Sequence, residues 1–291
     1  MPLPKLLLCT DLDRTLIPNG PEAESPLARP FFRQLCNEPK LTLVYVSGRD
    51  KDLITVAIDE FNLPIPDYVI SDVGSVIYEI NNNIWSVFQQ WSNTIALDWN
   101  KYSPQDIHNI LSPITQLILQ EPSKQNTHKL SYYLPLQHSH STITHKIEHI
   151  LTSKNINANI IWSIETIKNT GLIDILPASA NKLTAIRWLA GNIDICENSI
   201  LFAGDSGNDI DVINSSISSI IVANASNEFK SLALSISQAK HTESRLYVAQ
   251  GMSDEMNGNY ASGIIEGVCH YIPEAEAWFE STSRSLRKAS S

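Results

Sequence analysis

Residues 6–16 read L-L-L-C-T-D-L-D-R-T-L, and this stretch decides the fold of the chain. An apolar run of strand length ends abruptly in two aspartates, as in a buried strand of a parallel sheet. Ligands of open α/β sheets lie beyond the carboxyl ends of the strands, and residues two apart on an extended end point to the same side. We therefore expect Asp11 and Asp13 to face one small anionic or metal-bound ligand together.

Three later segments place polar groups at further strand ends or at a helix start. The apolar run 41–46 ends in S-G-R, the predicted helix 181–189 opens with a lysine in its first turn, and the run 199–203 ends in G-D-S-G-N-D. Because the carboxyl ends of parallel strands meet at one edge, we expect these groups to join the two aspartates. The candidates are Ser47, Gly48, Lys182, Asp205, Asn208 and Asp209.

The composition narrows the class of protein. The chain has 291 residues, 43% hydrophobic and 18% charged, which is ordinary for a soluble globular enzyme. A formal charge of −10 argues against a nucleic-acid surface or an anionic membrane, so we expect neither partner. The four cysteines show no metal-ligand spacing, and the start lacks a charged leader. We therefore expect a cytoplasmic protein with reduced thiols.

The order of predicted elements indicates an α/β fold with two units. We expect a Rossmann-like parallel-sheet core over 1–86 and 178–291, with the tail after about 280 disordered, and an inserted small α/β cap domain over 87–177. Helices are predicted at 31–36, 50–61, 104–119, 142–151, 181–189, 227–234 and 260–271. Strands are predicted at 41–46, 67–70, 75–80, 84–88, 129–136, 158–164, 172–176, 199–203 and 219–222, after the first one.

The order Asp, Ser, Lys, Asp at these strand ends resembles the haloacid dehalogenase superfamily of phosphohydrolases. In finer detail the chain is similar to sucrose-phosphate phosphatases over nearly its whole length. V-G-S-V-I-Y at 73–78 and K-L-S-Y-Y-L at 129–134 carry this finer similarity. The resemblance implies Mg²⁺-dependent release of phosphate from sucrose 6-phosphate, with Asp11 as nucleophile, Asp13 as acid and base, and Asp205 as metal ligand.

The chemistry of a phosphate monoester fits the same residues. Its uncatalysed hydrolysis is very slow, so a site must supply a nucleophile, positive charge and a proton for the leaving group. Asp11 can form an aspartyl-phosphate, but only if a cation separates it from the dianionic phosphate. We expect the Mg²⁺ site to consist of Asp11, Asp13, Asp205 and Asp209, with Asp209 better suited to fixing Lys182 or a metal-bound water than to direct ligation. We expect the phosphate oxygens to be held by Ser47, Gly48, Lys182 and Asn208.

The sugar and the partner are less constrained. Lys129, Tyr132 and Asp174 are predicted sugar contacts in the cap, and a sucrose-phosphate synthase-like glycosyltransferase is a predicted partner. Leu16 and Arg14 depart from the pattern of sucrose-phosphate phosphatases. The alternatives are therefore a phosphatase of glucosylglycerol phosphate or mannosylglycerate phosphate, a phosphomannomutase-like transferase, or a non-catalytic regulatory subunit of a glycosyltransferase.

Two further patterns need an interpretation. Residues 145–149 match the H-x-x-E-H pattern of inverted zinc metalloproteases, but we interpret them as the exposed face of a cap helix. Arg49 follows Ser47 and Gly48 and could pair with a core carboxylate, so we leave it out of the catalytic set.

Overall fold

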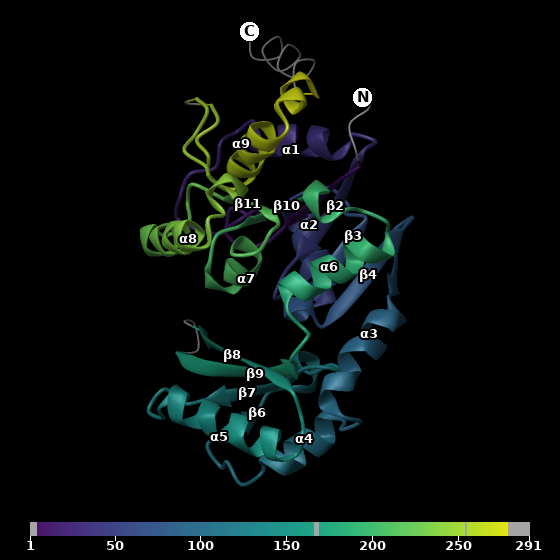
Figure 1. Cartoon of the computed structure of the whole chain (residues 1–291), viewed down its shortest axis with the longest axis vertical. Coiled ribbons are helices and arrows are strands. Elements are labelled where there is room, and N and C mark those ends of the chain that lie inside the picture. The colour runs from purple at the N-terminus through teal and green to yellow at the C-terminus, as the bar shows by residue number, and fades with distance from the viewer. Residues whose placement is uncertain (1–4, 166–168, 254, 279–291) are drawn as a thin grey trace.

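The computed structural model describes residues 5–165, 169–253 and 255–278, whose strands form two sheets (Figure 1). The large sheet has eight strands in the order β12-β11-β10-β1-β2-β3-β4-β5. Strands β12 to β3 in this order run parallel, and β4 and β5 extend the edge as antiparallel strands. The prediction of an α/β fold with a parallel core sheet is confirmed. The strands are β1 (Leu6–Thr10), β2 (Leu41–Val46), β3 (Tyr68–Ser71), β4 (Val76–Asn81), β5 (Ile84–Val87), β10 (Ile200–Gly204), β11 (Ser218–Ile221) and β12 (Leu246–Val248).

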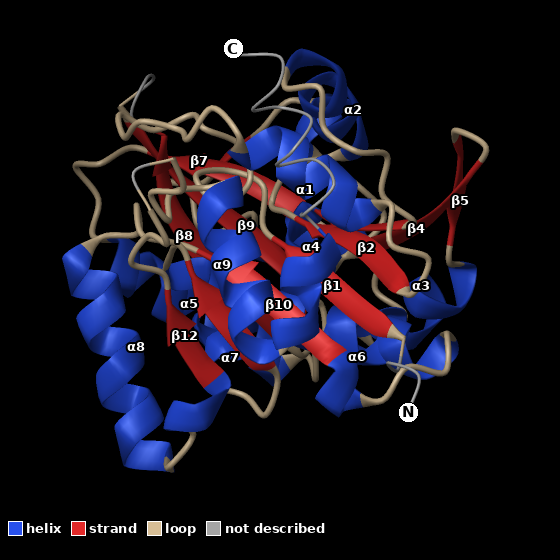
Figure 2. Ribbon diagram, turned by 90° about the horizontal axis from the view of Figure 1, so that it is seen from above, coloured by secondary structure: helices blue, strands red, loops and turns tan. Residues whose placement is uncertain are grey.

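Helices cover both faces of the large sheet (Figure 2). Along β1, Leu6 and Leu8 belong to the hydrophobic cluster on one face, and Leu7 and Cys9 to the cluster on the other. This double burial explains why β1 is a continuous apolar run. One face packs against α1 (Ala28–Cys36), α2 (Lys51–Glu60) and α9 (Ala261–Tyr271). The other packs against α3 (Gln89–Ala96), α6 (Lys182–Asn192), α7 (Ile210–Ile213) and α8 (Asn227–Lys240).

The small sheet is antiparallel, with the order β6-β7-β9-β8. Its strands are β6 (Ile118–Leu119), β7 (Leu130–Leu134), β8 (Ala158–Glu165) and β9 (Thr170–Pro177). A third hydrophobic cluster joins one face of this sheet to α4 (Pro104–Leu111) and α5 (His140–Ser153). We propose that residues 87–177 form the cap inserted into the core of 1–86 and 178–291.

Local chemistry explains where the elements differ from their predicted limits. Helix α4 ends at Leu111, not at residue 119, because Pro113 cannot continue a helix and restrains the residue before it. Helix α3, whose Trp91 and Ile95 are buried against the core, was not predicted. The tail after about 280 lies outside the described residues. None of the helices in the described part of the chain is long and apolar enough to cross a membrane.

Candidate active site

Neighbouring strand ends bring three carboxylates together. Asp11 follows β1 and Asp205 follows β10, and these strands pair in parallel, with the Asp11 N–H donating to the Ala203 carbonyl at 2.9 Å. Asp11, Asp205 and Asp209 are buried and each offers one oxygen within 4.8 Å of the others. Within the described ranges, this is the one group of three or more His, Cys, Asp or Glu side chains close enough to share a metal ion. An all-oxygen set of few carboxylates suits Mg²⁺.

Lys182 balances part of this negative charge. It is the first residue of α6 and is 2% exposed, and Asn181 caps the helix by accepting from the Thr184 N–H. Its Nζ lies 2.6 Å from Asp209 Oδ1 and 3.2 Å from Asp11 Oδ1. Burial disfavours the ammonium, but the charges of Asp11 and Asp209 outweigh burial and raise the pKa of Lys182. The lysine therefore carries a fixed positive charge next to Asp11.

Backbone N–H groups of the same loop hold the Asp209 carboxylate. Its Oδ2 accepts from the N–H of Asp205 at 3.1 Å and of Ser206 at 3.3 Å. A Cβ on Gly204 would lie 2.5 Å from this oxygen, so only glycine leaves room for the carboxylate there. Asp209 is fully buried and Asn208, next to it, lines the cleft. Since one Asp209 oxygen faces Lys182 and the other the backbone, its position is tightly fixed.

Burial, together with neighbouring carboxylates, raises the pKa values of Asp11 and Asp205. Burial is the largest cause of the shift in Asp11, and the charges of Asp209 and Asp205 add to it. Lys182 acts in the opposite direction, and the net result is that the pKa of Asp11 is raised to about 8. For Asp205, burial and the charge of Asp209 raise the pKa to about 6. Lys182 pairs with Asp11 and Asp209, and Arg14 lies 3.5 Å from Asp205, so three carboxylates face two positive side chains. A divalent cation would supply the missing positive charge.

Asp13 has a different environment from the other aspartates. Arg49 Nε donates to Asp13 Oδ2 at 2.8 Å and Arg49 Nη2 to Oδ1 at 2.7 Å, and Asn19 Nδ2 donates to Oδ1 at 2.6 Å. Burial opposes ionisation, but the hydrogen bonds and charge of Arg49, with Asn19, hold the pKa of Asp13 below its usual range. Arg49, which sequence reasoning left out, therefore belongs to the site.

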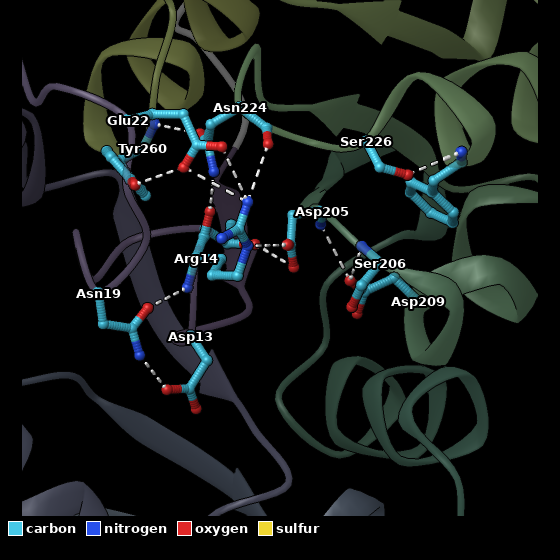
Figure 3. A network of polar contacts seen from close by, with 12 residues as sticks. Asp13, Arg14, Asn19, Glu22, Asp205, Ser206, Asp209, Asn224, Ser226 and Tyr260 are labelled. Carbon is cyan, nitrogen blue, oxygen red and sulfur yellow. Dashed lines mark hydrogen bonds and ion pairs between the residues drawn. The ribbon is translucent and has the colours of Figure 1, made fainter. Parts of the chain in front are cut away.

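Arg14, the departure noted in the first loop, points away from Asp13 (Figure 3). Its Nη2 donates to Glu22 at 3.1 Å and to the Asn224 carbonyl at 3.2 Å, while its Nε lies 3.5 Å from Asp205 Oδ2. Tyr260 donates its hydroxyl to Glu22 at 3.0 Å. The guanidinium thus joins the first loop to the outer side of Asp205.

The two residues that follow β2, Ser47 and Gly48, differ in their access to the cleft. Gly48 lines the same hollow as Asp11. Ser47 is 1% exposed, and its hydroxyl accepts from the Arg49 N–H at 3.2 Å. In this arrangement Ser47 fixes the loop that carries Arg49.

The cleft continues from the large sheet to the small one. A hollow of about 600 Å³ is lined by Asp11 and Asp13, and a second of about 760 Å³ by cap residues. The two share Gly48 and the loop 206–208. Residues on the cap side include Gln120, Lys124, Lys129, Tyr133, Trp162 and Asp174. A ligand that reaches Asp11 can therefore extend under the small sheet.

Strand alternation corrects one predicted sugar contact. Leu130, Tyr132 and Leu134 point into the cap's own hydrophobic cluster, where the Tyr132 hydroxyl lies 2.9 Å from His108 Nδ1. Tyr132 therefore faces away from the cleft, and its neighbour Tyr133 lines it, because successive strand residues point to opposite faces.

The other two predicted cap residues, Lys129 and Asp174, do line the cleft. Lys129 Nζ lies 3.3 Å from Asp72 Oδ1, so the cap side of the cleft is tied to the loop after β3. Asp174 accepts from the Ser131 hydroxyl, on the paired residue of β7.

The zinc-protease pattern has no metal site in the described chain. His145 and His149 lie on the exposed outer face of α5, and His145 Nδ1 lies 3.1 Å from Glu148. No further His, Cys, Asp or Glu of the described residues joins them.

Comparison with known proteins assigns the family. The family described as Sucrose-6F-phosphate phosphohydrolase matches residues 4–272. The chain belongs to this family. It is a hydrolase of phosphoric monoesters, and its substrate is a sugar phosphate. The resemblance stated from the sequence is confirmed.

Relatives from known proteins match this phosphohydrolase over nearly the whole length of its chain. A chain of Nitrosococcus oceani, named only as a HAD-like hydrolase, is 44% identical over 95% of this chain and 74% of its own. Mannosylfructose-phosphate phosphatase of Agrobacterium fabrum is 29% identical over 92% of this chain and 97% of its own. The sucrose-phosphatase of Synechocystis, solved with sucrose and phosphate, has a TM-score of 0.71 and 25% identity, covering 92% of this chain and 98% of that one.

Two cleft residues of this phosphohydrolase escaped sequence reasoning. Arg49 stands in S-G-R, and its neighbours were selected, so the signal was present but ambiguous. Tyr133 adjoins the selected Tyr132, and only the register of β7 separates them. When a strand carries aromatic residues on both faces, its sequence does not indicate which face lines the cleft.

Proposed function

We propose that this chain is a Mg²⁺-dependent phosphatase of a glycosylated fructose phosphate, with sucrose 6-phosphate as the first candidate. The observation that carries the proposal is the buried group of Asp11, Asp205 and Asp209 with Lys182, at the bottom of a cleft that the cap sheet overhangs. A cluster of acids with one lysine suits an anionic phosphate only when a further cation is bound, which favours metal-assisted phosphoryl transfer.

In the first step, an Asp11 oxygen attacks phosphorus and the bond from phosphorus to the sugar oxygen breaks. The leaving oxygen takes a proton from Asp13, which lines the same hollow. Asp13 has to enter this step protonated, and the negative charge of the bound ester favours this against the charge of Arg49. In the second step, a water molecule gives a proton to Asp13 and attacks the aspartyl-phosphate, releasing phosphate and restoring Asp11. Splitting one slow displacement into two lowers the barrier of each.

The remaining residues hold charge and geometry. Lys182, the Gly48 N–H and Asn208 are proposed to bind the transferred oxygens, and Ser47 holds the loop beside them. Asp11, Asp205 and Asp209 are proposed to hold Mg²⁺, with the Asp13 carbonyl as a further candidate. When bound, the ion neutralises and polarises the phosphoryl oxygens. Asp209 contributes even without direct ligation, because it fixes Lys182 at 2.6 Å.

The sugar is proposed to lie under the cap sheet, near Lys129, Tyr133 and Asp174. The second candidate substrate is mannosylfructose phosphate, which is favoured by the 29% identity to that phosphatase over 97% of its length. Both candidates are phosphorylated disaccharides that contain fructose, and they differ in the second sugar. A glycosyltransferase that makes the substrate stays a predicted partner, and a cytoplasmic location stays a prediction.

The test is phosphate release from sucrose 6-phosphate, mannosylfructose phosphate and a panel of sugar monophosphates, with and without Mg²⁺. We expect activity with Mg²⁺, its loss with a chelator, and its loss in Asp11→Asn. Asp211→Asn, an exposed aspartate of α7, is the matched control and should keep activity. Preference for another glycoside phosphate would reject the sugar and keep the mechanism, whereas no release from any ester would reject the hydrolase.

A further inference from the structure

The proposed function leaves Arg49, a charged residue that lines the cleft, without a role. Its guanidinium binds the Asp13 carboxylate with two hydrogen bonds, Nε to Oδ2 at 2.8 Å and Nη2 to Oδ1 at 2.7 Å. Two parallel charge-assisted bonds fix both the distance and the plane of a carboxylate. We propose that Arg49 is a positioning residue that holds Asp13 toward the leaving-group oxygen, an inference that rests on the proposed function.

Asp13 needs such a restraint. Its side chain is 42% exposed on the loop beyond β1, and the next residue, Arg14, has a φ of 58°. Asn19 holds Oδ1 at 2.6 Å, but Oδ2 is held by Arg49. Without the guanidinium, the carboxylate could rotate about its side-chain bonds while Asn19 kept one oxygen. A proton donor that is misplaced by about 1 Å loses much of its effect.

Arg49 is itself well anchored. Its backbone N–H donates to Ser47 Oγ at 3.2 Å, and its carbonyl accepts from the Asp72 N–H at 3.0 Å. Its Nη1 also donates to the Leu53 carbonyl at 3.4 Å, within the first turn of α2. Because β1 and β2 pair in parallel, this anchor at the end of β2 stands directly beside the loop that carries Asp13.

The other arginine of the cleft does not share this task. Figure 3 shows Arg14 turned toward Glu22, Asn224 and Asp205, whereas the Asp13 carboxylate points away from Arg14 and contacts Asn19. The rival role for Arg49 is direct binding of the substrate phosphate, since it also lines the hollow. The two roles differ in what they do to KM and to the dependence on the leaving group.

The experiment compares two esters under single-turnover conditions. The rate at which the leaving group is released is measured, which isolates the first step. Sucrose 6-phosphate, or mannosylfructose phosphate if the wild type prefers it, has a poor leaving group that requires a proton. p-Nitrophenyl phosphate has a good leaving group that does not. The variants are Arg49→Gln, Arg49→Lys, Asp13→Asn and the double variant Arg49→Gln/Asp13→Asn. Arg187→Gln, which removes a similar arginine fork to Glu197 on the exposed surface, is the control.

We expect Arg49→Gln to slow the sugar ester by about 10- to 100-fold and p-nitrophenyl phosphate by less than about 3-fold, with KM nearly unchanged, because a positioned acid contributes about 10²- to 10⁴-fold. Arg49→Lys should show the same selective loss, since a point charge cannot hold both oxygens. The double variant should be no slower than Asp13→Asn, as for residues that act as a unit.

Three outcomes would overturn the inference. An equal rise in KM for both esters would assign Arg49 to phosphate binding. An equal loss of rate for both esters in both Arg49 variants would assign it a structural role. Additive losses in the double variant would show that Arg49 does not act through Asp13. A wild type that hydrolyses neither ester would reject the proposed function itself, which is a distinct result.

Discussion

Replacing Lys182 with methionine tests the charge balance of the site most directly. Its ammonium lies 3.2 Å from Asp11 and 2.6 Å from Asp209, and at an effective dielectric constant of about 20 each contact corresponds to about 5–6 kcal/mol of attraction. The cost of burying the ions offsets much of this attraction. Removing one partner of a buried ion pair costs about 3–5 kcal/mol, because the remaining charges stay buried and uncompensated.

We therefore expect Lys182→Met to lower the free energy of unfolding by about 3–5 kcal/mol at about pH 8 without metal. The loss should be smaller at about pH 5, where Asp11, whose pKa is raised to about 8, has taken up a proton, and adding Mg²⁺ should recover part of it. Urea unfolding followed by tryptophan fluorescence measures the change. Lys146→Met, an exposed lysine of α5, should change the value by less than about 0.5 kcal/mol. A loss below about 1 kcal/mol for Lys182→Met, or one that Mg²⁺ does not reduce, would refute the reasoning.

Three further changes probe the site and the cap. Burial and neighbouring charges raise the pKa of Asp11 to about 8 and of Asp205 to about 6, so both acids are more protonated at low pH. The Mg²⁺ affinity measured by calorimetry should therefore rise from about pH 5 to 8, and binding should release protons. Gly204→Ala would place a Cβ 2.5 Å from Asp209 Oδ2, so Mg²⁺ binding and phosphate release should fall strongly while thermal unfolding shifts by only a few degrees. Gly171→Ala would force a Cβ into the ring of Trp162. We expect the free energy of unfolding in urea to fall by about 1–3 kcal/mol, and an unchanged midpoint would contradict this packing.

Much of the site could be predicted because its residues sit at the ends of recognisable strands. A buried parallel strand needs apolar residues on both faces, so the run before Asp11 and the run before Asp205 were visible in the sequence. Strands β1 and β10 are neighbours in the sheet, which brings Asp11 and Asp205, far apart in the sequence, to one edge. The sequence also placed Lys182 in the first turn of a helix, because residues 181–189 have a helical pattern. The structure shows that Asn181 caps this helix.

The contacts between side chains were beyond the sequence. An arginine after a strand can pair with any nearby carboxylate, and only the adjacency of β1 and β2 assigns Arg49 to Asp13. A run of two tyrosines in a strand does not say which one faces a cleft, so Tyr132 was wrongly preferred to Tyr133.

The sequence by itself determined the α/β class, the strand-end aspartates and the resemblance to phosphohydrolases, because these depend on local patterns of polarity and on short motifs. Only the tertiary structure decided which charges meet. The pairing of Lys182 with Asp11 and Asp209, of Arg49 with Asp13, and the register of β7 depend on distances between segments that the chain folds together. Electrostatic interactions depend on such distances and on burial, and neither is written in residue order.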